Sequence, residues 1–388
     1  MARSLTLRDA SHLLRRAAAR GRKEEAERLA SVGLEAAVES LLATPAHPPK
    51  PTFNPDDQRK QIQDLMDNWL GWWLKTPTPA AERLVLFWHG HFTTEARTLP
   101  GPASAILMWT QFHAFRSFGY GPFSEILGAV ARDPAMLIYL DNATSRKEHP
   151  NENWARELME LYTTGVGNYT ENDVLEAARA FTGWSVKRAQ QGAPLTQPEF
   201  LFRRDWNDSG PKTFLGKTIK TGEEVLEILS NHPETYRFVG RKLLRFYFSP
   251  EPAASLVDEG AKVLREMGTR EFLRWLFTRD AFYSPEARNT IIKSPVEYLI
   301  GLHYAAGESS FDSRKFFGGF ASMGQIPFNP PNVKGWDGGM EWVSETPLLT
   351  RLNLLGAFSG KEKKLDLEVF MDGADGALAL VKPEAQLL

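Results

Sequence analysis

The chain has no cysteine among its 388 residues. This absence excludes disulfide bridges, thiolate catalysis and metal centres held by cysteine. Any metal ion would therefore need nitrogen or oxygen ligands. The sequence also has no apolar run close to the ~18 residues that a membrane-spanning helix requires. We therefore expect no membrane span.

An excess of charge of one sign is also missing. The 46 basic and 48 acidic side chains leave a formal net charge of −2. Proteins that bind nucleic acid normally carry a basic excess or a basic stripe, so we expect no nucleic-acid partner. The first residues lack the apolar core of a signal peptide, which predicts a cytoplasmic location.

The features that are present indicate helices. Apolar residues make up 42% of the chain and charged residues 24%, a balance typical of globular proteins. Apolar residues recur at helical spacing through most of the chain. Weak alternation and turn residues interrupt this pattern and predict a small β-hairpin around residues 199–220. The expected fold class is all-α, a single large multi-helix domain with that hairpin excursion.

We expect one helical domain over residues 1–355 and a C-terminal tail over 356–388. Within the domain we expect an N-terminal helical hairpin (5–43), a proline-rich linker (44–55), motif-bearing helices (56–184), an extended or β insertion (185–221), and C-terminal helices with a Gly/Trp loop (222–355). The segments expected to be helical are 5–19, 23–29, 34–42, 56–74, 79–89, 122–131, 134–139, 151–163, 171–182, 223–229, 233–246, 253–266, 269–277, 295–305 and 314–321.

A dense polar stretch occupies residues 149–165. Its ordinary interpretation is a solvated helix face with one ion pair between Glu152 and Arg156, worth ~0.2–0.5 kcal/mol. The alternative is a reactive site, because carboxylates serve as general acids or bases and arginine stabilises developing negative charge. The candidate catalytic residues are Glu157, Arg156 and Glu160, and the candidate substrate-binding residues are Asn151 and Asn153.

A second polar motif is His89-Gly90-His91. In a continuous helix, residues two apart point about 200° apart, so the two imidazoles would not share one ion. If Gly90 ends the helix, His91 can turn beside His89. The residues then predicted to bind a divalent metal ion of zinc or manganese type are His89, His91 and Glu152. The alternative is a pair of core histidines with ordinary hydrogen bonds.

Further candidates for substrate binding are scattered along the chain. Asp208 and Lys212 flank a Ser-Gly-Pro sequence that is also typical of a turn. Trp336 lies in a glycine-rich loop, where a tryptophan can stack on a ligand or fill a gap between helices. The remaining two candidates are Asp141 and Asn142.

The motifs in this chain are Phe87–Thr93, Tyr139–Asn142, Asn151–Leu161, Tyr169–Thr170, Ala178–Trp184, Lys212–Gly216, Lys293–Pro295 and Asn332–Trp336. Together they resemble a bacterial family catalogued as domain of unknown function 1800. The resemblance extends from about residue 5 to residue 355. It implies a predominantly helical domain and brings no established activity.

The resemblance also carries implications beyond the fold. Many members of that family look exported and are encoded beside a sulfatase-like family, catalogued as domain of unknown function 1501, which implies such a partner. This chain departs from the family at one motif, because Asn207 stands where relatives often have histidine. We therefore leave Asn207 out of the candidate site.

Three functional hypotheses remain open from the sequence. The first is a metal-assisted hydrolase-like enzyme, in which the ion lowers the pKa of a bound water and a carboxylate acts as general base. The second is a non-catalytic scaffold or binding module for a partner protein or glycan, with a structural buried polar network. The third is an oxidase with iron at the same ligands.

Overall fold

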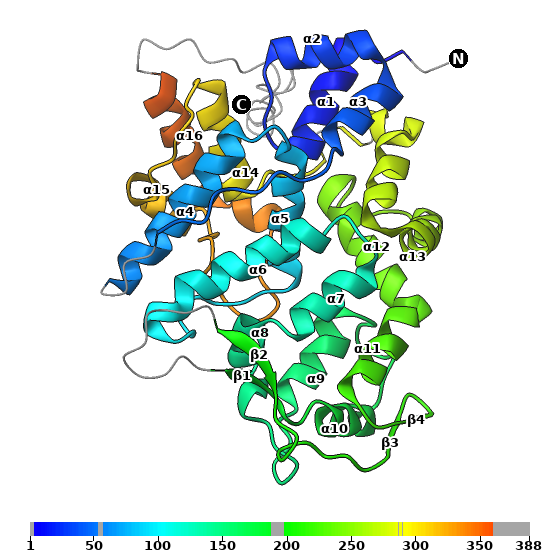
Figure 1. Cartoon of the computed structure of the whole chain (residues 1–388). Coiled ribbons are helices and arrows are strands. Elements are labelled where there is room, and N and C mark those ends of the chain that lie inside the picture. The colour runs from blue at the N-terminus through cyan, green and yellow to red at the C-terminus, as the bar shows by residue number, and fades with distance from the viewer. Residues whose placement is uncertain (1–3, 53–56, 188–197, 286, 289, 360–388) are drawn as a thin grey trace.

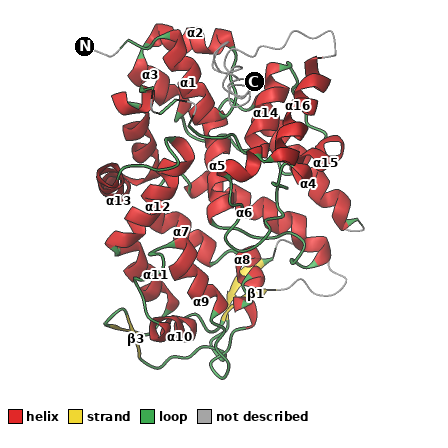
Figure 2. Cartoon of the chain, turned by 180° about the vertical axis from the view of Figure 1, so that it is seen from behind, coloured by secondary structure: helices red, strands yellow, loops and turns green. Residues whose placement is uncertain are grey.

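The computed structural model describes residues 4–52, 57–187, 198–285, 287–288 and 290–359. Helices make up most of this part of the chain, and the strands form two small antiparallel sheets. The all-α fold with a small hairpin is therefore confirmed. Figure 2 shows how helices fill the molecule, with the strands at one end.

Most of the helices lie close to the ranges that apolar spacing predicts, whereas those over Ser104–Phe118 and Glu345–Ser359 were not predicted. Their bounds are α1 (Leu7–Ala18), α2 (Lys23–Val32), α3 (Leu34–Leu41), α4 (Gln58–Lys75), α5 (Pro79–His91), α6 (Ser104–Phe118), α7 (Phe123–Ala131), α8 (Pro134–Tyr139), α9 (Asn153–Glu157), α10 (Glu171–Ala180), α11 (Gly222–Asn231), α12 (Pro233–Tyr247), α13 (Ala254–Phe277), α14 (Pro295–Ala305), α15 (Ser313–Ser322) and α16 (Glu345–Ser359). Short 3₁₀ turns occupy Gly101–Ala103, Asn142–Thr144, Asp280–Tyr283 and Gly339–Val343.

The strands form two separate pairs. β3 (Lys212–Phe214) and β4 (Lys217–Ile219) form the predicted hairpin. Its two-residue turn has positive φ at both positions, which suits the twist of a tight hairpin. β1 (Trp184–Lys187) pairs antiparallel with β2 (Glu199–Phe202) at the edge of the helices.

Helix α5 lies in the middle of the molecule, with α1 to α3 above it and α4 beside it (Figure 1). Nearly all of its residues are buried, and they belong to one apolar cluster that extends from Leu5 to Phe358. Two charged residues of α5 are buried as well and are paired. Glu82 accepts two hydrogen bonds of 2.7 Å from Arg116, and Arg83 pairs with Glu297 at 2.6 Å.

The C-terminal end of α5 corrects one prediction. Gly90 does not end the helix, which continues to His91 and is followed by Phe92. The reason lies in tertiary packing, because another segment lies against this turn. A Cβ on Gly335 would lie only 2.9 Å from the carbonyl oxygen of Gly90, so the loop around Gly335 covers the backbone there.

The polar stretch at residues 149–165 is not a uniform helix. α9 (Asn153–Glu157) passes directly into a π-helical turn over Leu158–Tyr162. The wider turn leaves the α-helical hydrogen-bonding pattern, and such turns occur frequently at functional sites. The sequence predicted an ordinary helix over 151–163, so the π turn is a feature that apolar spacing did not reveal.

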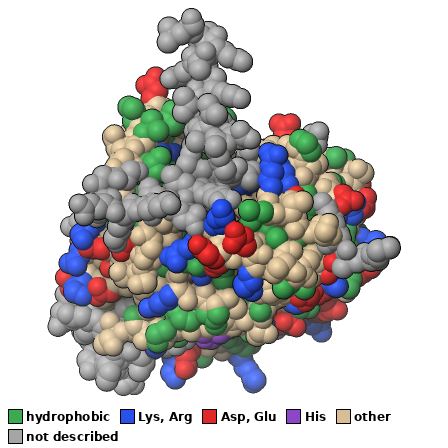
Figure 3. All heavy atoms as spheres, turned by 90° about the horizontal axis from the view of Figure 1, so that it is seen from above, with side chains coloured by type: hydrophobic (Ala, Val, Ile, Leu, Met, Phe, Trp, Pro, Cys, Tyr) green, Lys and Arg blue, Asp and Glu red, His purple; other side chains and the backbone are tan. Residues whose placement is uncertain are grey.

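No helix in the described part of the chain is long and apolar enough to cross a membrane. On the face shown in Figure 3, acidic and basic side chains are interspersed. This surface agrees with the small formal net charge of −2.

Candidate functional site

The two histidines of α5 each tie a distant segment to the core. His89 Nε2 accepts a hydrogen bond of 3.1 Å from the backbone N–H of Phe328. His91 Nε2 donates one of 3.1 Å to the carbonyl of Tyr162, the last residue of the π turn. Both imidazoles are buried. Each therefore acts as a connection between secondary-structure elements.

These bonds imply opposite tautomers. His89 Nε2 accepts a hydrogen bond, so the proton of this ring is on Nδ1, whereas His91 Nε2 donates and therefore carries the proton of its ring. Both rings are neutral, because burial lowers the pKa of His89 to about 3 and holds the pKa of His91 well below its usual value. Within the described residues, neither Nδ1 atom has a hydrogen-bond partner.

The predicted metal ligands do not come together in this structure. His89 packs against Trp336 and Phe328, whereas His91 packs against Phe87 and Tyr162. The described residues contain no group of three or more His, Asp or Glu side chains placed to hold a metal ion. The third predicted ligand, Glu152, is engaged elsewhere.

Arg156 forms an ion-pair network near the surface. It pairs with Glu152 at 3.0 Å, as the i, i+4 spacing predicts, and with Glu171 of α10 at 2.8 Å. The hydrogen bonds that Arg156 donates to Glu171 come first among the causes that raise the pKa of Arg156. Both arginine bonds to Glu171 are 2.8 Å, so the contact is bidentate. Arg156 therefore links α9 to α10.

The asparagines also serve local structure. Asn142 is fully buried and donates to the carbonyls of Phe181 and the first residue of β1. Asn151 accepts a hydrogen bond of 2.9 Å from the backbone N–H of Asn153, at the start of α9. Asn153 in turn donates to the carboxylate of Asp141 at 3.2 Å. These bonds shape the turn that leads into α9.

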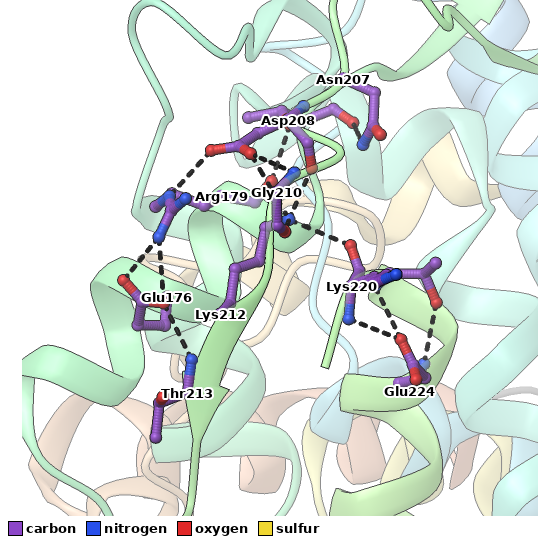
Figure 4. Close-up of polar contacts among 11 residues, drawn as sticks. Glu176, Arg179, Asn207, Asp208, Gly210, Lys212, Thr213, Lys220 and Glu224 are labelled. Carbon is purple, nitrogen blue, oxygen red and sulfur yellow. Dashed lines mark hydrogen bonds and ion pairs between the residues drawn. The ribbon is translucent and has the colours of Figure 1, made fainter. Parts of the chain in front are cut away.

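Asp208 and Lys212 lie in a separate network around the β3–β4 hairpin (Figure 4). The ammonium of Lys212 donates to the backbone carbonyls of Asp208, Gly210 and Lys220, and its side chain is fully buried. Asp208 accepts from the backbone N–H of Gly210 at 2.9 Å and pairs with Arg179 at 2.8 Å. Turn chemistry accounts for both residues.

Trp336 lies against the end of α5. Its ring lies 5.2 Å from that of His89 in an edge-to-face contact, and the side chain is half-buried. Thr93 holds the same loop by a hydrogen bond from its hydroxyl to the carbonyl of Val333. The loop at residues 332–336 therefore closes over the end of α5.

Glu157 differs from the other motif residues. It is half-buried, and within the described residues no hydrogen bond or ion pair engages its carboxylate. Burial, followed by the negative charge of Glu160, raises its pKa, while Arg156 and Lys334 oppose that rise. Because no described group donates to it, the Glu157 carboxylate remains available to solvent or to a ligand.

The surroundings of Glu157 define what we term the Glu157 cluster: Glu95, Tyr139, Glu157, Glu160 and Lys334. Burial and the charges of Glu95 and Glu157 raise the pKa of Tyr139 to about 12. Glu160 accepts a hydrogen bond of 3.4 Å from Tyr169. Sequence reasoning missed Glu95, Tyr139 and Lys334 as site residues. Tyr139 and Lys334 lie within quoted motifs, which was the signal for them.

Two cavities in the described part of the structure are lined by residues outside this cluster. One, of about 150 Å³, is bordered by Pro48, Trp72 and Phe311. Another lies beside β4, between Lys217 and His232. The Glu157 cluster is therefore a site at the surface, where half-buried side chains meet solvent.

Neither the curated proteins nor the solved structures contain a match to this chain. A family model described as "Protein of unknown function (DUF1800)" matches residues 12–386, nearly the whole sequence and well beyond residue 355. The chain therefore belongs to this family, as its motifs indicated.

Proposed function

We propose that this protein is a non-catalytic binding module, and that the Glu157 cluster binds a ligand rich in hydroxyl or amino groups, such as a glycan. The observation that carries the proposal is the carboxylate of Glu157, which is half-buried and has no donor among the described residues. A ligand that supplied O–H or N–H groups would satisfy it. Polar groups that the protein itself leaves without a partner are expected mainly at functional sites.

The polar groups around the Glu157 cluster are already hydrogen-bonded within the protein, and this supports the proposal. His91 fixes the end of the π turn, Thr93 fixes the loop that carries Lys334, and Arg156 fixes α9 to α10. The residues that surround Glu157 are therefore held in place before any ligand arrives. Such pre-organisation reduces the entropy that binding would otherwise cost.

The test is a binding screen with neutral and amine-bearing oligosaccharides, using Glu157→Gln and the matched variant Glu152→Gln. We expect Glu157→Gln to weaken binding at least about tenfold, which corresponds to ~1.4 kcal/mol, without lowering the melting temperature. Glu152→Gln should bind normally. The proposal is wrong if no oligosaccharide binds, or if both variants lose binding equally. A marked fall in the melting temperature of Glu157→Gln would instead indicate a purely structural carboxylate.

A second candidate is acid–base hydrolysis of the bound ligand. It is favoured by one observation, the raised pKa of Glu157 beside a second carboxylate, Glu160. Paired carboxylates with different pKa values are typical of glycoside hydrolysis. Product release from a bound oligosaccharide, abolished by Glu157→Gln, would replace the binding proposal with this one. A metal-assisted route would further require His89, His91 and Glu152 to converge, and elemental analysis of tag-free protein tests it.

A further inference from the structure

Two histidines far from the Glu157 cluster lie in ring contact. His47 belongs to the proline-rich linker and His113 to α6, and the centroids of their rings are 4.5 Å apart with an angle of 35° between the ring planes. Both residues are exposed. Two imidazoles from segments 66 residues apart therefore meet where solvent ions reach them.

The linker is held along α6 by neighbouring contacts. The ammonium of Lys50 lies 5.2 Å from the centroid of the Trp109 ring, and the ring of Trp109 lies 5.3 Å from that of His113. The backbone N–H of Ala46 donates to the hydroxyl of Thr78 at 3.0 Å. The position of His47 is thus set by contacts on both sides of it.

The charges around the pair permit a cation to approach. Partial burial of the rings against the protein and the charge of Arg116 lower the pKa of both imidazoles, which favours the neutral form that binds metal ions. His113 Nδ1 lies 3.5 Å from the hydroxyl of Ser117, so its Nε2 is the nitrogen available to an ion. Arg116 itself is neutralised by two hydrogen bonds of 2.7 Å to Glu82. The other nearby positive group, Lys50, is engaged with Trp109.

The ring separation also suits a shared ion. Metal–nitrogen distances of about 2.0–2.1 Å place the centroids of two imidazoles on one tetrahedral ion roughly 5 Å apart. The observed separation of 4.5 Å is close to this value, so small rotations of two exposed side chains would reach it. Neutral imidazole is a preferred ligand for zinc, nickel and copper.

We propose that His47 and His113 form a two-imidazole site for a divalent transition metal ion, with water completing the coordination, and that the bound ion fastens residues 44–50 to α6. The site is independent of the Glu157 cluster. Two protein ligands leave several positions open, so the ion would exchange with solvent.

Calorimetric titration of tag-free protein with zinc chloride, and separately with nickel chloride, tests the site. We expect one ion per chain in the wild type, and binding at least about tenfold weaker in His47→Ala and in His113→Ala, since even residues behind metal ligands contribute 10–100-fold. His149→Ala, which removes another exposed histidine, should bind like the wild type. No saturable binding, or binding that survives both substitutions, would overturn the site.

Hydrogen exchange tests whether the bound ion holds residues 44–50 against α6. Zinc should slow the exchange of backbone amides in residues 44–50 of the wild type and leave them unchanged in His113→Ala. Slower exchange that depends on His113 supports the whole proposal. Saturable binding with unchanged exchange would retain the metal site and overturn its effect on the linker.

Discussion

Histidine serves in the interior of this protein as an uncharged, hydrogen-bonded ring. Burial lowers the pKa of His12 to about 2 and that of His89 to about 3, and it holds the pKa of His91 well below its usual value. Each ring bonds a backbone group far away in the sequence, such as the carbonyl of Phe282 for His12. Protonation of any of these rings would break a contact between elements or leave a buried charge.

The first prediction concerns acid. Because the folded pKa values of these histidines lie below the unfolded value of about 6.5, protons favour the unfolded chain, and stability is lost as pH falls from 6.5 toward 3. His91→Gln keeps a donor for Tyr162 and removes one titrating ring. We expect urea unfolding to show a shallower loss of stability with acid in this variant. An unchanged slope, equal to that of His149→Gln, would contradict the prediction.

The second prediction concerns Asp133, which caps α8 and accepts a hydrogen bond from Gln111. Burial raises its pKa to about 7. The charged form is therefore penalised in the folded state, and stability falls as pH rises from about 4 to 7.

Asp133→Asn removes that penalty. Asparagine also caps helices well, and a flip of the Gln111 amide would present its unpaired oxygen to the new amide. At pH 7 we expect the variant to be more stable by at least ~1.4 kcal/mol, the equivalent of a tenfold change in acidity. Chemical denaturation at pH 4 should show a smaller difference. A difference that does not grow with pH would show that the aspartate stays protonated or is solvated.

At the scale of elements, α13 is two helices joined at a bend. Gly268 has φ +82 and ψ −178, a backbone conformation that is essentially restricted to glycine. A Cβ there would lie 3.0 Å from backbone atoms of Gly121, which also accepts a hydrogen bond from Thr269. The bend thus docks the second half of α13 onto the turn before α7.

The third prediction follows from this bend. Gly268→Ala should lower the free energy of unfolding by ~1–3 kcal/mol from backbone strain and by a further ~1–3 kcal/mol from overpacking. Gly167→Ala is the control, since Gly167 has φ +93 but an added Cβ would meet no described atom within 4 Å. Equal losses in the two variants, measured by denaturation, would show that contact with Gly121 contributes nothing.

Most elements were predictable because local pattern and packing agree. Thr170 with Asp173 forms a capping box at the start of α10, and Pro79 begins α5 as expected. Two helices were missed. α6 is apolar around much of its circumference, so it gives little periodic signal. α16 exposes Leu349 and Leu352, which obscures its amphipathic face.

The candidate site was less predictable than the fold. The motifs identified the right segments, but a side chain's partner depends on what tertiary structure brings to it. His89 bonds a backbone 239 residues away, and Lys334 reaches Glu157 from the last fifth of the chain. Helix α5 also ends at His91, two residues beyond the range predicted from its sequence. The spacing of residues within one segment does not reveal which distant residues will contact it.

At the scale of the molecule, Arg83 joins four helices. From α5 it pairs with Glu297 of α14 and donates to the carbonyls of Arg16 in α1 and Phe246 in α12. The pair is buried, with 2% and 4% of the two side chains exposed, so water does not compensate for a lost partner.

The fourth prediction is that Arg83→Met lowers the free energy of unfolding by ~3–5 kcal/mol, because Glu297 is left buried and unpaired. Lys60→Met removes an exposed partner of Asp64 and should cost no more than about 0.5 kcal/mol. Chemical denaturation of both variants provides the comparison. Similarly small losses of stability in the two variants would mean that water replaces the contacts of Arg83 or that these contacts contribute little.

These contacts join residues that are far apart in the sequence, which affects how the protein folds during its synthesis. Helices α1 and α5 lie in the first quarter of the chain, yet the groups that engage them at Phe282, Glu297 and Phe328 emerge only in the final third of translation. Until then His12 and His89 lack these backbone partners, and Arg83 lacks its carboxylate partner. We therefore expect a nascent chain that stays incompletely folded through most of its synthesis, and depends on chaperones that shelter its apolar segments.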